Sequence, residues 1–531
     1  MYTDGPSRGA SPSLRPGFEP SRFDFFSRPW IPWTIVGLGI VLRVLAYLHN
    51  PSLWLDEAFL AQNLVQRDFA ALTRPLDHAQ VAPLLFLWAE RCVLRVAGSG
   101  EMALRFIPFL ASCAILPLAL WVGRRCLSAG ALRIALLLLA LSAPLIDYSV
   151  QVKPYPLDVV FALLILCVTL RLVQNRDPGR DFLFLGVLGV LAPWTSFPAL
   201  FVMAAAFAVL LLARGRPAPR RWRVSLGVVL LLWIASDAVF ALSTWDWQGR
   251  DALRRTWRQY GGFAPFPPRT GTDILWYLRA SVRAIGMPGG LQVRSVGILL
   301  AALGAAVLAA RRHWTVLGLL GLPIGFTLGA SALVLYPFAD RLILFLAPAL
   351  TFFAATGLAT LWSETARALR VGRARPWSRS RSAGPLLLAA ALAATALSIG
   401  VECERALRQV RHPIAREEIR ELVAILRRDA RPDDVVYVYY GAAPAFDYYA
   451  PRPAWRVRYG VNARREPQRY AADVDCLAGE PRVWVLLSHV HERGGVSEAD
   501  LIRARLDRAG RCLAEHGRRG GALLLYDLSP P

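Results

Sequence analysis

Two adjacent carboxylates, those of Asp56 and Glu57, stand among apolar residues in the stretch Ser52-Leu53-Trp54-Leu55-Asp56-Glu57-Ala58. Acidic side chains are costly near a membrane and are usually kept there for a function. A carboxylate in the wall of a cavity can act as a general base and take the proton of an attacking hydroxyl. The pair also fits a helix N-terminus, with Asp56 as N-cap and Glu57 in the first turn. The sequence leaves both interpretations open.

A second group of candidates surrounds Lys153, the single lysine among 61 Lys and Arg residues. A lysine ammonium is a compact cation that suits a phosphate group. It also suits the membrane interface, where a long side chain can extend to water. Tyr148, Gln151, Tyr155 and Asp158 lie in the same stretch. Asp158 is a candidate ligand, and its alternative interpretation is a first-turn helix acid.

Arginines on the expected outer side of the membrane form a third group. Arg255 and Arg258 lie in a segment rich in Arg, Trp and Tyr, residues 245–269, and Arg341 stands at the head of a later apolar run. Positive residues are less common outside than inside, and an anionic lipid headgroup would account for them. A solvated loop is the alternative.

Signals for other chemistry are weak. The seven cysteines lack the spacing of metal sites. Cys476 and Cys512 could form a disulfide or stay free, and His489-x-His491 is a weak candidate for metal binding. Motifs of nucleotide-binding loops, zinc proteases and serine hydrolases are absent. The sequence indicates no cofactor, and a divalent metal has no ligand cluster to support it.

The elements that must position these residues are membrane helices. The chain is 55% hydrophobic, with a mean hydropathy of +0.38, whereas soluble domains contain roughly 45–50% apolar residues. Many apolar runs approach the roughly 20 residues that a spanning helix needs. The net charge is +23, nearly all of the positive residues are arginines, and many of them lie in short loops between these runs. Such charge orients helices in a membrane and does not indicate nucleic acid as a partner.

The apolar runs predict a polytopic α-helical membrane protein with about eleven spans, its N-terminus cytoplasmic and its C-terminus outside. The expected spans are 31–48, 105–122, 132–146, 157–172, two within 182–212, 224–242, 296–310, 316–335, 342–361 and 385–399. Residues 81–96 are apolar but carry three charges, so we expect a helix at the interface. Arg43, near the outer end of the first span, is expected to extend to the interface.

Composition also divides the chain into three parts. Residues 1–30 are rich in Pro, Ser, Gly and Arg and predict a disordered cytoplasmic tail. Residues 31–401 form the membrane domain. Residues 402–531 alternate short apolar runs at 435–440, 483–487 and 523–526 with helical patterns. This alternation predicts an extracytoplasmic α/β domain.

Five short segments follow one another on the expected outer side of residues 31–361. They are Trp54-Leu55-Asp56-Glu57-Ala58, Gln80-Val81-Ala82-Pro83-Leu84-Leu85-Phe86, Glu101-Met102-Ala103-Leu104-Arg105, residues 148–155 and residues 336–348. In this order they resemble the C-type membrane glycosyltransferases. More closely, they resemble the bacterial relatives of protein O-mannosyltransferases and of the lipid A aminoarabinose transferase, in glycosyltransferase family 39.

The resemblance implies a C-type glycosyltransferase fold and a donor sugar linked to polyprenyl phosphate, with a lipid, glycan or protein as acceptor. It implies that Asp56 is the catalytic base, with Glu57 as its neighbour. The residues expected at the donor phosphate are Lys153, Arg341, Arg255 and Arg258. The residues expected to bind acceptor or support the site are Gln151, Tyr148, Tyr155, Asp158 and His78. Gln151 stands where the family commonly has Glu, which predicts altered specificity or compensation by Asp158.

We therefore expect an enzyme of the bacterial plasma membrane that transfers a sugar with inversion at the outer face. A flippase or other transporter of lipid-linked sugars is the main alternative, and a catalytically degenerate assembly partner is another. Transporters tend to show repeated halves and a site near the midplane. The sequence shows no internal repeat, and the candidate polar groups gather at the outer ends of spans, which favours the enzyme.

Overall fold

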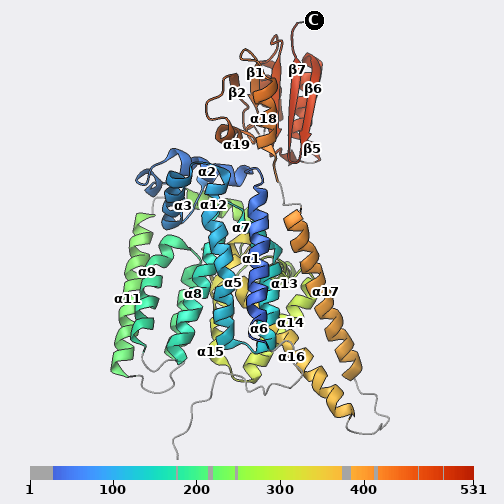
Figure 1. The fold of residues 1–531 in the computed structure, drawn as a ribbon. Helices are drawn as coiled ribbons and strands as arrows, with labels where there is room; N and C mark the ends of the chain where they lie inside the picture. The colour runs from blue at the N-terminus through green and yellow to red at the C-terminus, as the bar shows by residue number, and fades with distance from the viewer. Residues whose placement is uncertain are drawn as a thin grey trace, which may run out of the picture.

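The structure is a computed structural model of the chain, and it describes residues 28–174, 178–212, 219–244, 249–373, 384–411, 416–463, 466–493 and 495–530. A bundle of long helices carries at one end a smaller region of helices and strands (Figure 1). Residues 1–27 of the predicted tail, and residues 245–248 of the arginine-rich segment, lie outside the described residues.

Every apolar run predicted to span the membrane lies in a helix of the bundle. These helices are α1 (Ile31–His49), α5 (Phe106–Cys126), α6 (Ala129–Leu141), α7 (Ala143–Ser149), α8 (Tyr155–Gln174), α9 (Gly179–Thr195), α10 (Ala199–Leu212), α11 (Arg220–Ser243), α14 (Arg294–Ala310), α15 (Trp314–Ala332), α16 (Ala347–Arg373), which follows the 3-10 turn η4 (Asp340–Leu346), and α17 (Gly384–Arg411). In the described residues, six helices are long and apolar enough to cross a membrane, or seven if the bent pair α6–α7 is one span. The chain is a multi-pass helical membrane protein, as predicted.

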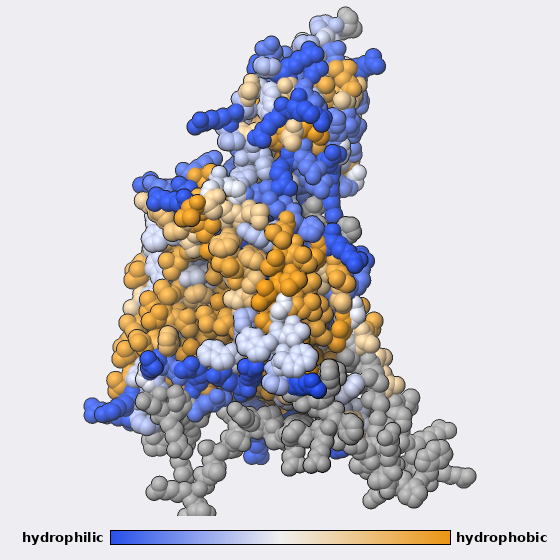
Figure 2. Space-filling view, in the orientation of Figure 1, coloured by the Kyte–Doolittle hydropathy of each residue, from blue (hydrophilic) through white to orange (hydrophobic). Residues whose placement is uncertain are grey.

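The outer surface of the bundle is apolar. Figure 2 shows a belt of hydrophobic residues across the face of the bundle in view, with hydrophilic residues at both ends. Large apolar side chains point outward from several helices, and Leu183, Leu231 and Leu299 are 68%, 67% and 70% exposed. Such a surface is unfavourable in water and suits the lipid of a bilayer.

Short helices cover the end of the bundle that faces the C-terminal region. Helices α2 (Leu55–Gln66), α3 (Leu84–Ala97) and α12 (Gly249–Gln259) lie at this end (Figure 1). Helix α3 includes most of residues 81–96, the segment predicted as an interfacial helix, and it packs beside α2. The other short elements are η2 (Ala71–Thr73), η3 (Asp77–Ala79), α4 (Glu101–Leu104) and α13 (Gly271–Gly286).

The C-terminal region is a mixed α/β structure, as predicted. Its sheet has the order β2-β1-β3-β7-β6, and β1 is parallel to both of its neighbours. The strands are β1 (Val435–Val438), β2 (Arg456–Tyr459), β3 (Val483–Ser488), β6 (Arg511–Arg518) and β7 (Gly521–Asp527), and a small hairpin holds β4 (Glu492–Arg493) and β5 (Val496–Ser497). The helices are α18 (Ile419–Asp429), α19 (Ala443–Tyr449), α20 (Pro467–Asp475) and α21 (Glu498–Ala509). Strands β2 and β6 were not predicted, because these edge strands are mostly polar and exposed.

The C-terminal region packs directly on the segment that follows α1. One apolar cluster contains Leu53 and Leu60 from that segment together with Ile419 and Phe446 from the C-terminal region. Helix α17 continues through residue 402, where the sequence analysis placed the domain boundary. The C-terminal region is therefore held against the segment that contains Asp56 and Glu57.

Arg43 in α1 is fully buried, so the prediction that it extends to the interface is wrong. Helices α6 and α7 meet at a bend of 48°, and such a break leaves backbone carbonyls without helical partners. The Arg43 guanidinium donates to Leu139 O at 3.1 Å and to Ala140 O at 3.3 Å. It also donates to the Ser112 hydroxyl at 2.8 Å. Arg43 therefore stabilises the bend.

Replacing Arg43 by Met should destabilise the fold, because these buried acceptors would lose their donor. We expect a loss of about 1–3 kcal/mol in the free energy of unfolding, measured by denaturant titration in detergent micelles. Arg311→Met, at an exposed position after α14, is the control and should leave the free energy of unfolding unchanged. Equal stability of the two variants would contradict the role of Arg43.

Candidate active site

Three segments that are far apart in the sequence meet at one end of the bundle. Asp56 lies in the first turn of α2, Lys153 in the loop before α8, and Arg341 in η4. Lys153 Nζ is 3.2 Å from Asp56 Oδ1, and Arg341 Nη2 is 3.1 Å from Asp56 Oδ2. Two cations thus hold the two oxygens of one carboxylate. All three are predicted site residues, and we call them the ion triad.

The ion triad is partly closed to solvent. The side chains of Lys153, Asp56 and Arg341 are 8%, 19% and 29% exposed. Burial raises the pKa of Asp56, but the charges of Lys153 and Arg341 outweigh burial and hold the pKa below its ordinary value. Burial lowers the pKa of Lys153, and the Asp56 charge opposes that shift. Asp56 is therefore a carboxylate at neutral pH.

Gln80, which the sequence analysis placed only in a family motif, contacts the ion triad. Its side-chain oxygen accepts a hydrogen bond from Lys153 Nζ at 3.0 Å. Lys153 therefore has two partners, the carboxylate of Asp56 and the amide of Gln80. The second partner fixes the direction of the ammonium group without adding a charge. A polar residue within an apolar motif was the signal that could have found it.

Helix α12 contributes an aromatic ring to the ion triad. The Arg341 guanidinium lies 6.0 Å from the centre of the Trp257 ring, within the range of a cation–π interaction. The predicted phosphate ligands Arg255 and Arg258 are exposed on the same helix. Neighbouring residues of a helix face different directions, so Trp257 faces the triad while these two arginines remain in solvent.

Four further predicted residues lie around the site without contacting Asp56 in the described structure. Tyr148 and Tyr155 pack edge to face, with 5.2 Å between ring centres. Asp158 lies in the first turn of α8 and is 5% exposed. His78 is exposed and stacks on the ring of Phe59 at 4.4 Å. The two tyrosines lie close enough to Arg341 to interact with its charge, and His78 lies beside α2 through its contact with Phe59.

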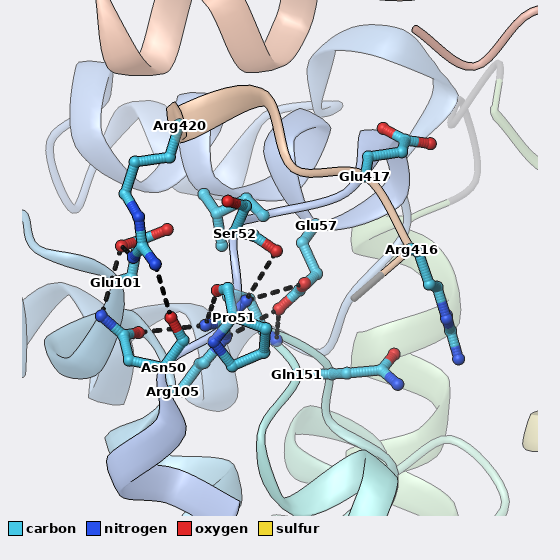
Figure 3. A network of polar contacts seen from close by, with 12 residues as sticks. Asn50, Pro51, Ser52, Glu57, Glu101, Arg105, Gln151, Arg416, Glu417 and Arg420 are labelled. Atoms are coloured by element: carbon cyan, nitrogen blue, oxygen red, sulfur yellow. Dashed lines mark hydrogen bonds and ion pairs between the residues drawn. The ribbon is translucent and has the colours of Figure 1, made fainter. Parts of the chain in front are cut away.

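Glu57, the second predicted catalytic residue, is engaged elsewhere. Its carboxylate is 2% exposed and receives two hydrogen bonds from Arg105, at 3.1 Å and 3.0 Å (Figure 3). Glu57 Oε1 also accepts the backbone N–H of Val152 at 2.9 Å. The side chain ties α2 to the loop that carries Lys153. These contacts join Glu57 to Arg105 and Val152, and its catalytic role stays a prediction.

Gln151 is buried and donates from Nε2 to Asp147 Oδ2 at 2.8 Å. Asp147 also accepts hydrogen bonds from Arg416 at 3.0 Å and from Gln409 at 3.2 Å. A glutamate at position 151, the common residue of the family, would place a second carboxylate beside Asp147. Gln151 instead offers Asp147 a neutral hydrogen-bond donor, which avoids repulsion between two carboxylates.

The described part of the chain contains no cluster of side chains that could bind a metal ion. No three His, Cys, Asp or Glu side chains there are placed to hold an ion. His489 Nδ1 lies 2.8 Å from Glu417 Oε1, which gives that histidine another partner. All seven cysteines, which are all described residues, are free, so Cys476 and Cys512 form no disulfide.

One family model matches part of the sequence. Residues 81–240 match the model described as dolichyl-phosphate-mannose-protein mannosyltransferase. The matched segment contains Lys153 and the stretch 148–158. None of the curated proteins matches the sequence at a significant level.

Solved membrane proteins share the fold. ArnT from Cupriavidus metallidurans, bound to undecaprenyl phosphate, aligns with a TM-score of 0.52 and 12% identity over 93% of this chain and 97% of that chain. The apo oligosaccharyltransferase of Archaeoglobus fulgidus aligns with a TM-score of 0.52 and 13% identity over 87% and 70%. AglB from the same organism, in complex with an inhibitory peptide and a dolichol-phosphate, aligns with a TM-score of 0.50 and 13% identity over 95% and 75%.

The matched segment and the shared fold agree with the resemblance predicted from the sequence. Residues 81–240 are similar to a family of lipid-phosphate-sugar glycosyltransferases, and the chain shares the fold of ArnT. The segment match is to the dolichyl-phosphate-mannose-protein mannosyltransferase family. Asp56 and Arg341 lie outside the matched segment, and the fold brings them to Lys153.

The buried Glu57–Arg105 pair allows a double-mutant cycle. Glu57→Gln and Arg105→Met should each lower the free energy of unfolding by about 3–5 kcal/mol, because each leaves one buried group without its partner. The double variant should lose less than the sum of the two, since neither charge is left alone. Denaturant unfolding in detergent micelles measures all four proteins. Strict additivity would contradict the pairing.

The lowered pKa of Asp56 predicts how stability depends on pH. A carboxylate with a lowered pKa adds stability above its ordinary pKa of 3.8, and this stability is lost as the pH falls through the lowered value. The difference in thermal midpoint between wild type and Asp56→Asn should therefore be constant above about pH 5 and shrink below about pH 4. Asp251→Asn, at a position 77% exposed on α12, is the control. A difference that grows on acidification would contradict the ion triad.

Proposed function

We propose that the protein transfers a sugar from a polyprenyl-phosphate-linked donor to an acceptor hydroxyl or amine at the outer face of the membrane, with inversion. The observation that carries this proposal is the contact of Asp56 with two cations from separate segments, Lys153 and Arg341. The reaction needs a base for the attacking group. It also needs positive groups for the phosphate that leaves. The ion triad supplies both.

The two cations are assigned to the phosphate of the donor. Arginine binds phosphate oxygens through a planar fork, and lysine acts as a point charge. Structures of the same fold hold undecaprenyl phosphate in ArnT and a dolichol-phosphate in AglB, which supports this assignment. The apolar belt of the bundle offers surroundings for the lipid chain (Figure 2). The phosphate would then reach Lys153 and Arg341 at the end of the bundle.

Arrival of the phosphate would activate the base. In the free protein the two cations lower the pKa of Asp56, which makes it a weak proton acceptor. When Lys153 and Arg341 turn to the phosphate, Asp56 loses part of the positive charge that lowers its pKa. Burial, which raises the pKa of this carboxyl, is then less opposed. Donor binding and base strength are coupled in this proposal.

In the transfer step, the acceptor oxygen or nitrogen attacks the anomeric carbon from the side opposite the phosphate. The bond between that carbon and the phosphate oxygen breaks, and its electron pair leaves with the polyprenyl phosphate. Lys153 and Arg341 stabilise the negative charge that develops there. Asp56 takes the proton of the attacking group. Attack from the opposite side inverts the configuration of the sugar.

The proposal includes an arrangement in the membrane. The eleven apolar segments are eleven spans, with the N-terminus in the cytoplasm and residues 402–531 outside a bacterial plasma membrane. Arginines in the loops assigned to the inside support this orientation. Helices α9, α10 and α14 have 17, 14 and 17 residues. Spans this short are accommodated by local thinning of the bilayer.

A transporter of lipid-linked sugars is the alternative. Transporter sites lie near the midplane, often at broken helices between repeated halves. The ion triad instead lies at the end of the bundle, where the short helix α2 begins. This placement favours the enzyme. The degenerate-partner alternative rested on Gln151, and the hydrogen bond of Gln151 to Asp147 leaves Asp56 and its two cations in place.

Purified protein in lipid nanodiscs tests the proposal with a panel of radiolabelled polyprenyl-phosphate sugars. Wild type should transfer or slowly hydrolyse one of these donors. Asp56→Asn should lower the rate by about 10²–10⁴-fold, the range expected for loss of a general base. Asp251→Asn, on the exposed face of α12, should react at the wild-type rate.

Measuring donor affinity alongside the transfer rate shows whether Asp56→Asn affects the reaction or the binding of the donor. Asp56→Asn should bind the donor at least as tightly as wild type, because a neutral amide competes less with the phosphate for the two cations. Full activity of Asp56→Asn would contradict the proposal. Donor movement across sealed vesicles without sugar release would instead support the transporter.

A further inference from the structure

Helix α2, which presents Asp56, has no N-terminal cap of its own. The first N–H groups of a helix lack partners, and a Ser, Thr, Asp or Asn at the N-cap usually accepts from them. The N-cap residue of α2 is Trp54, whose side chain forms no capping hydrogen bond. Asp56, which the sequence offered as N-cap, is the second residue of the helix and faces two cations. The cap must come from another segment.

Glu417 supplies the cap from the C-terminal region. Its Oε2 accepts the backbone N–H of Leu55 at 3.0 Å, across a separation of 362 residues. Its Oε1 lies 2.8 Å from Nδ1 of His489. The Glu417 side chain is 5% exposed, so the carboxylate is fixed on both sides. A negative charge at this end of a helix also interacts favourably with the helix dipole.

Further contacts join the same two parts of the protein. Figure 3 shows that Arg416, Glu417 and Arg420 come from one segment of the C-terminal region, beside the loop that contains Pro51 and Ser52. The additional contacts are Arg416 over the Trp54 ring at 4.4 Å, Arg420 donating to Asn50 O at 3.0 Å, and Leu53 N–H donating to the Tyr449 hydroxyl at 2.7 Å. The loop that leads into α2 is therefore held along its length by the C-terminal region.

We propose that Glu417 is a positioning residue of the active site. Its cap on Leu55 fixes the first turn of α2 and thereby the direction in which Asp56 presents its carboxylate to Lys153, Arg341 and the acceptor. The C-terminal region is then part of the catalytic unit and more than an attached module. This inference rests on the proposed function of Asp56 as base.

The geometry explains why a remote cap matters for the reaction. Leu55 and Asp56 are consecutive, so a frayed first turn would move the carboxylate away from contacts of 3.1–3.2 Å. A misplacement of about 1 Å in an active site can cost about 10²-fold in rate. The donor phosphate is held by Lys153 and Arg341, which are on other elements. Loss of the cap should therefore reduce turnover and leave donor binding intact.

The test compares variants of the full-length protein in nanodiscs. Glu417→Leu removes the acceptor at similar size, and Glu417→Gln keeps an oxygen that can accept from Leu55. We expect Glu417→Leu to lower kcat at least about 10-fold, with the donor Kd within about twofold of wild type, and Glu417→Gln to stay within about threefold in kcat. Glu421 lies on α18 and forms an exposed ion pair with Arg518 of β6. Glu421→Gln, which breaks this pair, is the matched control and should match wild type.

Hydrogen exchange gives a readout that does not depend on activity. Peptides that cover residues 53–60 should exchange faster in Glu417→Leu and at the wild-type rate in Glu421→Gln. If wild type shows no turnover, the proposed function fails, while exchange still decides whether Glu417 caps α2. Wild-type kcat and exchange in Glu417→Leu would overturn the inference. Parallel loss of donor binding, turnover and thermal stability would assign Glu417 a purely structural role and overturn it as well.

Discussion

A carboxylate beside a membrane either takes up a proton or finds positive partners, because burial makes an isolated charge costly. Asp56 keeps its charge through ion pairs with Lys153 at 3.2 Å and Arg341 at 3.1 Å. The three residues come from α2, from the loop before α8 and from η4, so the ion triad exists only while these segments are held together. The bundle, the short helices at its end and the C-terminal region all contribute to holding them.

Each member of the ion triad is fixed by a contact outside the triad. Gln80 holds the ammonium of Lys153, and the ring of Trp257 lies beside the guanidinium of Arg341. The buried Glu57–Arg105 pair holds helix α2 at the residue next to Asp56. These contacts come from neutral side chains, Gln80 and Trp257, or from the Glu57–Arg105 ion pair, whose charges cancel. They orient the triad without adding unpaired charge, which leaves the two cations available for an anionic ligand.

Much of the architecture could be predicted from the sequence because it depends on local pattern. The long apolar runs form the helices of the bundle, and the short apolar runs of the C-terminal region form the strands β1, β3 and β7. Asp56 could be identified because it is a charged residue among apolar ones. Lys153 could be identified because it is the single lysine of the chain. The exposed strands β2 and β6 carry mixed residues, so their pairing is set by the rest of the sheet.

Local sequence patterns could not predict side-chain direction or contacts between distant residues. Asp56 and Glu57 are adjacent, yet with 3.6 residues per turn neighbours in a helix point about 100° apart. One of them therefore meets the two cations, and the other meets Arg105. Arg43 could equally have reached the interface, and only the bend between α6 and α7 explains its burial. The cap of Glu417 on Leu55 joins residues 362 apart, and no local pattern signals it.

In the proposed reaction, Lys153 and Arg341 exchange Asp56 for the phosphate of a lipid donor. The most direct test is a cryo-electron microscopy structure of the protein in nanodiscs with undecaprenyl phosphate. We predict that the phosphate lies between Lys153 Nζ and the Arg341 guanidinium, and that Asp56 has moved out of contact with at least one of them. A phosphate bound elsewhere, with both ion pairs of Asp56 intact, would contradict the claim.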